Sequence, residues 1–211
     1  MSIPKGARVL LDFIGDIEAP RGYNTIYGNN QGKLKKPVTE MTVDEILAEQ
    51  RSWTRKYGSS ATGRYQFMRA TLTGLKEEGV VRGDEKLDGP VQDRLGYHLL
   101  KRRGYAKYVA GSMSTDDFGK RLAQEWASLP VLKDTKGQKR PVTRGQSYYA
   151  GDGLNKSLVD PERVETTLKE VLAGRRRMPE KLQPKPQKGP TERAHLLDGI
   201  WWRKLFRLER D

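Results

Sequence analysis

The chain has 211 residues, enough to bury a hydrophobic core, and its length predicts one domain with an appendage. Cysteine is absent, which excludes disulfide bonds and thiolate chemistry, and no apolar run approaches the roughly 18 residues of a membrane-spanning helix. The formal net charge of +13 favours polyanionic partners such as nucleic acid, an acidic membrane or an anionic cell wall. A solvated lysine-rich surface explains the same charge equally well.

Neither a metal site nor a secretory signal is predicted. His98 and His195 are too few and too far apart to indicate zinc, so we expect no metal and no cofactor. Asp12 follows Val9–Leu11 before the hydrophobic region of a signal peptide can build, so we expect synthesis without such a signal.

The first predicted element is a helix that carries a carboxylate at its end. Apolar residues recur at helical spacing from Val9 to Ile17, and the helix must stop near Ala19 because Pro20 lacks an amide donor and restricts the residue before it. Glu18 then lies in the last turn, where the negative end of the helix dipole disfavours a charged carboxylate. Such a disfavoured position indicates a functional role.

The remaining elements predict a fold that is α+β but mainly α. Residues 20–40 combine turn-forming residues with a short β-prone piece, Thr25–Tyr27, and predict a small β-hairpin. Thr42–Glu45 has the pattern of a capping box and predicts a helix to about Trp53. Two further helices are expected over about 69–78 and 90–103. A third is expected to begin at a Ser114 cap and to end within 125–130, and after a long polar loop a fourth is expected to run from Pro161 until Gly174 ends it.

The composition changes after Gly174. We expect one domain over residues 1–174, a basic proline-rich linker over 175–191 and an amphipathic basic segment over 192–211. The last segment has an apolar stripe that includes Trp201. This stripe suggests docking onto an anionic membrane or onto a protein partner such as a virion component.

One hexapeptide, Gly63–Met68, has residue types that suit a saccharide cleft. Glycine allows close approach of a ligand to the backbone, and Arg64, Tyr65 and Gln66 supply planar donors and a stacking surface. Taken alone, such a hexapeptide is more often an ordinary strand-to-helix junction, so its weight depends on the rest of the chain.

Three motifs in order resemble one known family. Helix-terminal Glu18, then Ala61–Met68, then Trp126–Pro130 are similar in order and approximate spacing to the lambda-type phage endolysin transglycosylases, which belong to the lysozyme-like superfamily. The resemblance covers about residues 7–173. It departs at Ala19 and Pro20, where the family has a small or hydroxyl residue after the glutamate, and the tail after 174 has no counterpart.

The resemblance implies a lysozyme-like domain that degrades bacterial peptidoglycan. The bond cleaved would be the β-1,4 bond between N-acetylmuramic acid and N-acetylglucosamine, with 1,6-anhydromuramyl ends as products. Bacterial glycan strands are then the partner, and no specific nucleic acid is expected.

The chemistry of such a cleavage assigns a role to Glu18. Protonating the leaving oxygen requires a carboxylic acid, and Glu18 is the candidate. Hydrolases need a second carboxylate; Asp16 is a poor candidate because residues two apart on a helix point to different sides, and Glu40 is the better one. A transglycosylase needs none, because the muramyl C6 hydroxyl attacks its own anomeric carbon. Transglycosylase is favoured, and hydrolytic muramidase stays open.

Other candidate residues follow from the resemblance and from residue type. Gln66 is expected to hydrogen-bond sugar and Tyr65 to form a cleft wall, whereas Arg64 suits an ion pair and a ligand contact equally. Tyr148 and Tyr149 are candidates for the opposite wall. Trp126 is expected in the core.

The non-enzymatic alternative is an inert virion protein or polyanion-binding protein that keeps the fold, for which the charge and the tail argue. As an enzyme, the protein would be made in the host cytoplasm and act on the periplasmic cell wall. It would reach the wall through phage lysis, as part of a virion, or by export from a bacterium.

Overall fold

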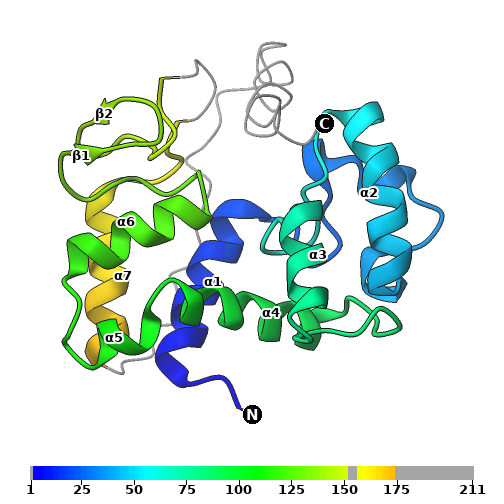
Figure 1. The fold of residues 1–211 in the computed structure, drawn as a ribbon, viewed down its shortest axis with the longest axis horizontal. Helices are drawn as coiled ribbons and strands as arrows, with labels where there is room; N and C mark the ends of the chain where they lie inside the picture. Colours follow the sequence, from blue (N-terminus) through cyan, green and yellow to red (C-terminus); the bar gives the residue numbers. More distant parts are fainter. Residues whose placement is uncertain (1, 152–155, 174–211) are drawn as a thin grey trace. The chain divides into compact units, whose positions relative to one another are not determined.

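The computed structural model describes residues 2–151 and 156–173 (Figure 1). The chain forms two compact units. The central unit is residues 14–103, and the terminal unit combines residues 1–13 with the chain from Gly104 onward. Gly174, the linker over 175–191, the segment over 192–211 and its apolar stripe all lie outside the described residues.

Among the described residues, the fold is mainly helical with one small antiparallel sheet. The predicted fold class, α+β but mainly α, is therefore confirmed as far as the secondary-structure content goes. The boundary between the units falls within the first helix, α1 (Lys5–Glu18), which ends at Glu18 as the sequence predicts. None of the helices in the described part of the chain combines the length and apolarity that a membrane span needs.

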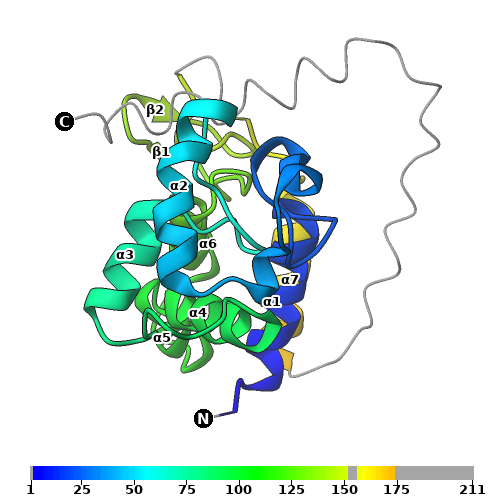
Figure 2. The same ribbon diagram turned by 90° about the vertical axis from the view of Figure 1, so that its right-hand side faces the viewer.

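The central unit is built from helices that follow the end of α1. They are η1 (Tyr27–Lys33), η2 (Val38–Glu40), α2 (Val43–Tyr57), α3 (Arg69–Glu77) and α4 (Gly89–Arg102). α2 and α3 lie side by side (Figure 2). The helices predicted near 69–78 and 90–103 are therefore confirmed to within a residue.

Local signals fix the start and the end of α2. Thr42 accepts the backbone N–H of Glu45, and the Glu45 carboxylate accepts the N–H of Thr42, which completes the predicted capping box. The helix runs one turn beyond Trp53, to Tyr57. It ends at Gly58, whose φ of 92° is the left-handed conformation that glycine adopts without strain.

The β-hairpin predicted for residues 20–40 is wrong. This segment forms the two short 3-10 helices η1 and η2, with Gly28 and Asn29 at positive φ inside η1. The β-prone piece pairs instead with a distant part of the chain, since Ile26 forms a bridge with Thr62 and Tyr27 donates its N–H to Ala61 O at 3.0 Å. The turn-forming residues therefore adopt helical turns, and the β-prone piece pairs with residues 36 and 34 positions away, Thr62 for Ile26 and Ala61 for Tyr27.

The terminal unit holds the sheet. Its elements after the first turns of α1 are α5 (Tyr105–Val109), α6 (Thr115–Glu125), β1 (Thr135–Lys136), β2 (Pro141–Val142) and α7 (Pro161–Ala173). The two strands are antiparallel, with Thr135 opposite Val142 and Lys136 opposite Pro141. The sequence predicts only a polar loop here and no helix at α5; both elements are too short for a periodic pattern.

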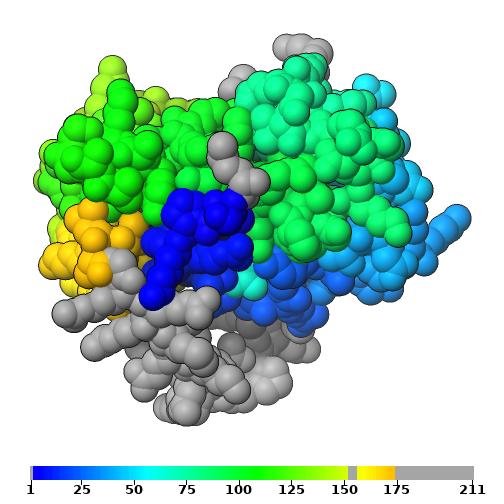
Figure 3. Space-filling model, turned by 90° about the horizontal axis from the view of Figure 1, so that it is seen from below, coloured from blue at the N-terminus to red at the C-terminus, as the bar shows by residue number. Residues whose placement is uncertain are grey.

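Aromatic stacking and close backbone approach hold the terminal unit together. Tyr108 stacks on Phe118 with ring centroids 4.6 Å apart and donates its hydroxyl to Leu168 O at 3.0 Å, so α5 contacts both α6 and α7. The start of α1 lies beside the end of α7 (Figure 3). A Cβ at Gly6 would lie 3.0 Å from Val171 O, which is why this helix face needs a glycine.

Candidate functional site

Glu18 is the last residue of α1, and the chain turns sharply after it. Ala19 donates its N–H to Gly15 O at 2.9 Å, and Gly22 donates to Ala19 O at 2.8 Å, so the turn begins directly at Pro20. The Glu18 side chain is partly exposed, with its Oε2 atom buried. The carboxyl group is therefore placed at the boundary between solvent and the interior of the central unit.

The motif loop, Gly63–Met68, is closed at its base by backbone hydrogen bonds. Thr62 and Phe67 exchange both of their N–H···O bonds, at 3.1 and 2.8 Å. Gly63 donates to Thr25 O at 2.7 Å, which fixes the loop against the segment that follows α1. Within the loop, Gln66 has a φ of 49°, an uncommon conformation for a residue other than glycine.

Arg64 connects the motif loop to the last turns of α1. Its guanidinium forms an ion pair with Asp16 at 3.0 Å and lies over the ring of Tyr23, 5.4 Å from the centroid. A Cβ at Gly15 would lie 2.2 Å from Nε of Arg64. The arginine side chain therefore passes directly over the helix backbone, and glycine is the residue that leaves room for it there. The motif loop therefore reaches α1 within one turn of Glu18.

Tyr65 and Gln66 turn inward. Tyr65 is 2% exposed and donates its hydroxyl to Asp93 Oδ1 at 2.7 Å. Burial, reinforced by this hydrogen bond to the carboxylate, raises the pKa of Tyr65 far above its ordinary range. Gln66 is 7% exposed, and its amide nitrogen donates to Gly63 O at 2.8 Å. Both side chains thus support the shape of the loop from inside.

Two buried glutamines hold the motif loop in place. Gln50 of α2 donates from Nε2 to Ser60 O at 2.7 Å and to Phe67 O at 3.0 Å. Gln92 of α4 accepts the N–H of Arg64 at Oε1, 2.7 Å away, and donates from Nε2 to backbone oxygens on two other segments. Sequence reasoning missed both residues. The sequence signal that could have identified them is a glutamine on the apolar side of a predicted helix.

Asp93 and Tyr23 are two further residues that sequence reasoning missed. Tyr23 donates to the same Oδ1 of Asp93 that accepts from Tyr65, at 2.9 Å. One carboxylate on α4 therefore joins the segment after α1 to the motif loop. Nothing in the local sequence around Asp93 marks this role, because both of its partners are distant in the chain.

The candidate second carboxylates have different surroundings. Asp16 is engaged with Arg64, as described above. Glu40 is exposed at the end of η2, and the contacts of the described residues do not join it to Glu18 or to the motif loop. Glu18, Asp16 and Arg64 are thus brought together within the central unit.

The remaining candidates belong to the terminal unit. Tyr148 and Tyr149 are partly exposed and meet edge to face, with ring centroids 5.2 Å apart. Tyr149 donates its hydroxyl to Gln124 O at 2.6 Å, and the Lys120 ammonium lies 6.0 Å from the ring centroid of Tyr148. Trp126 follows α6 and is 3% exposed, which confirms the prediction that it belongs to the core.

Metal ligands do not cluster in the part of the chain that the structure describes: it holds no group of three or more His, Cys, Asp or Glu side chains arranged to bind an ion. His98 has its Nε2 atom 3.0 Å from Glu78 Oε2 on the surface of the central unit.

Comparisons with protein-family models, with curated proteins and with solved structures found no match for this chain. A function for the protein therefore has to come from its own residues and their geometry.

Proposed function

We propose that the protein is a lytic transglycosylase with a lysozyme-like domain. It cleaves the β-1,4 bond between N-acetylmuramic acid and N-acetylglucosamine in bacterial peptidoglycan, with Glu18 as the general acid. The observation that carries the proposal is the contact of Arg64 with Gly15 and Asp16, because it brings the motif loop to the helix end that bears Glu18.

The position of Glu18 suits an acid that gives up its proton to a substrate. A partly exposed carboxyl group at the end of α1 can reach a bound sugar, while its Oε2 atom is buried in the central unit. Glu18 donates this proton to the O4 atom of the departing N-acetylglucosamine as the glycosidic bond breaks.

The same residue completes the reaction as a base. The muramyl C6 hydroxyl attacks its own anomeric carbon and closes a 1,6-anhydro ring, and the hydroxyl proton passes to the carboxylate of Glu18. The acid is thereby regenerated and no water is consumed. This route is favoured over hydrolysis because it needs no second carboxylate, and the sequence has no motif that marks one beyond the candidates Asp16 and Glu40.

In this proposal, Arg64, Tyr65 and Gln66 shape and support the cleft from the inside of the central unit. Tyr148 and Tyr149 offer aromatic surface in the terminal unit, the kind of surface on which sugar rings stack. The protein acts on the periplasmic cell wall after phage lysis or as part of a virion. The C-terminal tail supplies attachment to an anionic membrane or to a virion protein.

Mass spectrometry of digested cell walls tests the reaction. Purified peptidoglycan incubated with the protein should yield 1,6-anhydromuramyl ends, lighter by one water than hydrolytic ends. If the products carried only reducing ends, the reaction would be that of a hydrolytic muramidase. Glu40 would then be the next residue to substitute. An absence of any cleavage would favour the inert polyanion-binding protein.

A further inference from the structure

The turn of the β1–β2 hairpin carries a concentrated positive charge. Lys136 ends β1, and Lys139 and Arg140 precede β2, so three cations stand within five residues. All three side chains are exposed. The nearest acidic residue on the same segment is Asp134, which accepts the backbone N–H of Arg144.

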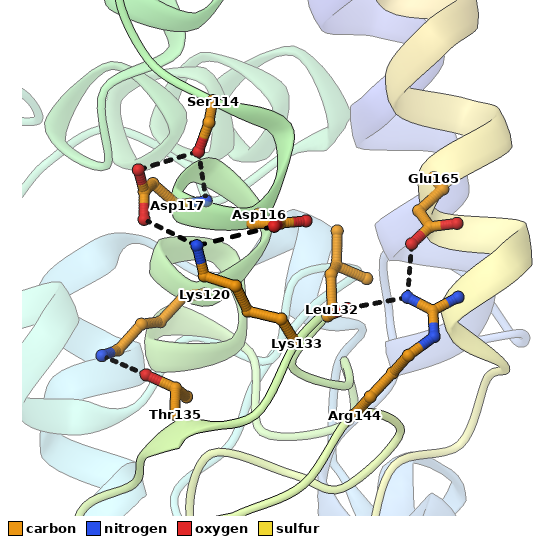
Figure 4. Close-up of polar contacts among 9 residues, drawn as sticks. All are labelled: Ser114, Asp116, Asp117, Lys120, Leu132, Lys133, Thr135, Arg144 and Glu165. Atoms are coloured by element: carbon orange, nitrogen blue, oxygen red, sulfur yellow. Dashed lines mark hydrogen bonds and ion pairs between the residues drawn. The ribbon is translucent and has the colours of Figure 1, made fainter.

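Cations on either side of the hairpin pair with carboxylates, whereas the described residues provide no such carboxylate for the cations at its turn. Lys133 lies 3.5 Å from Asp116 and Arg144 pairs with Glu165, as Figure 4 shows, and Arg144 also pairs with Glu162. Over residues 2–151 and 156–173, the ion pairs include none made by the three cations of the turn. Because the three side chains are exposed, an external anion can reach them.

The hairpin is fixed to the backbone of the segment that carries Tyr148. Gln138 donates its N–H to Tyr148 O at 3.0 Å, and a Cβ at Gly137 would lie 2.7 Å from the same oxygen. Lys120 of α6 donates to Thr135 Oγ1 at 2.8 Å, as Figure 4 shows, while its ammonium also lies near the ring of Tyr148. Lys120 and the ring of Tyr148 therefore lie beside β1, the strand that leads into the basic turn.

We propose that the surface of this basic turn, formed by Lys136, Lys139 and Arg140, binds the carboxylate-bearing peptide stems of peptidoglycan. The inference rests on the proposed function, since it names the part of the same substrate that the terminal unit recognises. Glycan strands alone are rich in hydroxyl and amide groups, which give a cluster of ammonium groups no charged partner. The stems carry free carboxylates on a flexible chain, and these match separated point charges.

The test compares binding to peptidoglycan with free and with blocked stem carboxylates. The Glu18→Gln protein, which should leave the glycan intact, is sedimented with purified, unmodified stem-bearing sacculi and with sacculi whose stem carboxylates have been amidated by carbodiimide coupling, which removes the charge and keeps the cross-linked network. The same background then carries Lys136→Gln together with Lys139→Gln, two exposed positions. Arg140 is left in place because its Nε donates to Ala150 O at 3.3 Å and so contributes to the local structure.

A matched control removes the same charge elsewhere. Lys35→Gln together with Lys56→Gln lowers the net charge equally, at exposed positions of the central unit. The hairpin double variant should bind stem-bearing sacculi about three- to tenfold more weakly than the control double variant, in line with two solvent-exposed ion pairs. The difference should vanish on amidated sacculi, and it should vanish near 1 M salt, where screening acts within about 3 Å.

Other outcomes overturn the inference. Equal losses in the two double variants would assign the effect to net charge. Unchanged binding to stem-bearing sacculi, with weakened binding to phosphatidylglycerol vesicles or to single-stranded DNA, would assign the surface to a lipid or a nucleic acid. Because sedimentation does not depend on turnover, failure of this inference is separate from failure of the proposed activity, which cell-wall cleavage by the unaltered protein tests.

Discussion

Gln92 lies so close to Gly63 that no side chain fits between them. A Cβ at Gly63 would be 2.3 Å from Oε1 of Gln92, the same atom that accepts the N–H of Arg64. Gln92 has no exposed surface, so it cannot move aside into solvent. The beginning of the motif loop is therefore fixed by an amide on α4.

This contact predicts a large cost for Gly63→Ala. Gly79→Ala is the matched control, because Gly79 also has a positive φ, 69° against 79° for Gly63, and has open space around it. The control should lose about 1 kcal/mol of unfolding free energy from backbone strain alone. Gly63→Ala should lose about 1–3 kcal/mol more from the clash. Urea unfolding measures both, and equal losses would mean that Gln92 does not confine the loop.

Tyr65 should resist ionisation in alkaline solution. Burial and the Asp93 carboxylate raise its pKa above the ordinary value of 10.0, so the folded protein should keep this hydroxyl protonated while exposed tyrosines ionise. The difference between ultraviolet titrations of the unaltered protein and of Tyr65→Phe isolates this group. Asp93→Asn should lower the pKa of Tyr65 while leaving it above the ordinary range, because burial remains. A Tyr65 transition near pH 10 in the folded protein would contradict the assignment.

Glu45 should make the stability of the central unit depend on pH. Lys36, 2.8 Å away, and the N–H of Thr42 lower the pKa of the Glu45 carboxyl below its ordinary value of 4.5. Since the folded-state pKa lies below the unfolded one, the stabilisation is present above about pH 4.5 and is lost as the pH falls through the folded value.

Thermal unfolding of Glu45→Gln follows this dependence. The variant keeps a side-chain oxygen for the capping box but cannot titrate, so its Tm should fall below that of the unaltered protein at neutral pH and approach it in acid. Lys36→Gln should reproduce part of the loss, because it removes the largest cause of the shift. A Tm difference that stays constant into the acid range would show that Glu45 is not the titrating group.

The helix boundaries could be predicted from the sequence because their signals are local. Pro20 sets the end of α1 at Glu18, and Thr42 with Glu45 sets the start of α2. Ser114 likewise accepts the N–H of Asp117 and caps α6. Each of these signals acts between residues a few positions apart, where sequence and geometry are directly linked.

Features that depend on distant residues could not be predicted in the same way. The prediction of a hairpin within residues 20–40 was wrong because Ile26 pairs with Thr62. No local sequence pattern distinguishes that distant partner from a nearer one. The inward direction of Tyr65 follows from Asp93, twenty-eight positions later. Residue type identified the motif loop, whereas its buried supports, Gln50 and Gln92, became apparent only from the fold.

The role of Glu18 as the acid is the central claim, and cell-wall clearing by Glu18→Gln tests it most directly. The glutamine keeps the shape of the side chain and much of its hydrogen bonding but has no carboxyl proton to give. Glu40→Gln is the matched control, since it makes the same change at an exposed carboxylate on η2. Clearing of purified peptidoglycan should fall about a hundredfold or more for Glu18→Gln, with circular dichroism and Tm unchanged, and should stay near the original rate for Glu40→Gln. A folded Glu18→Gln protein that clears cell walls at nearly the original rate would contradict the account.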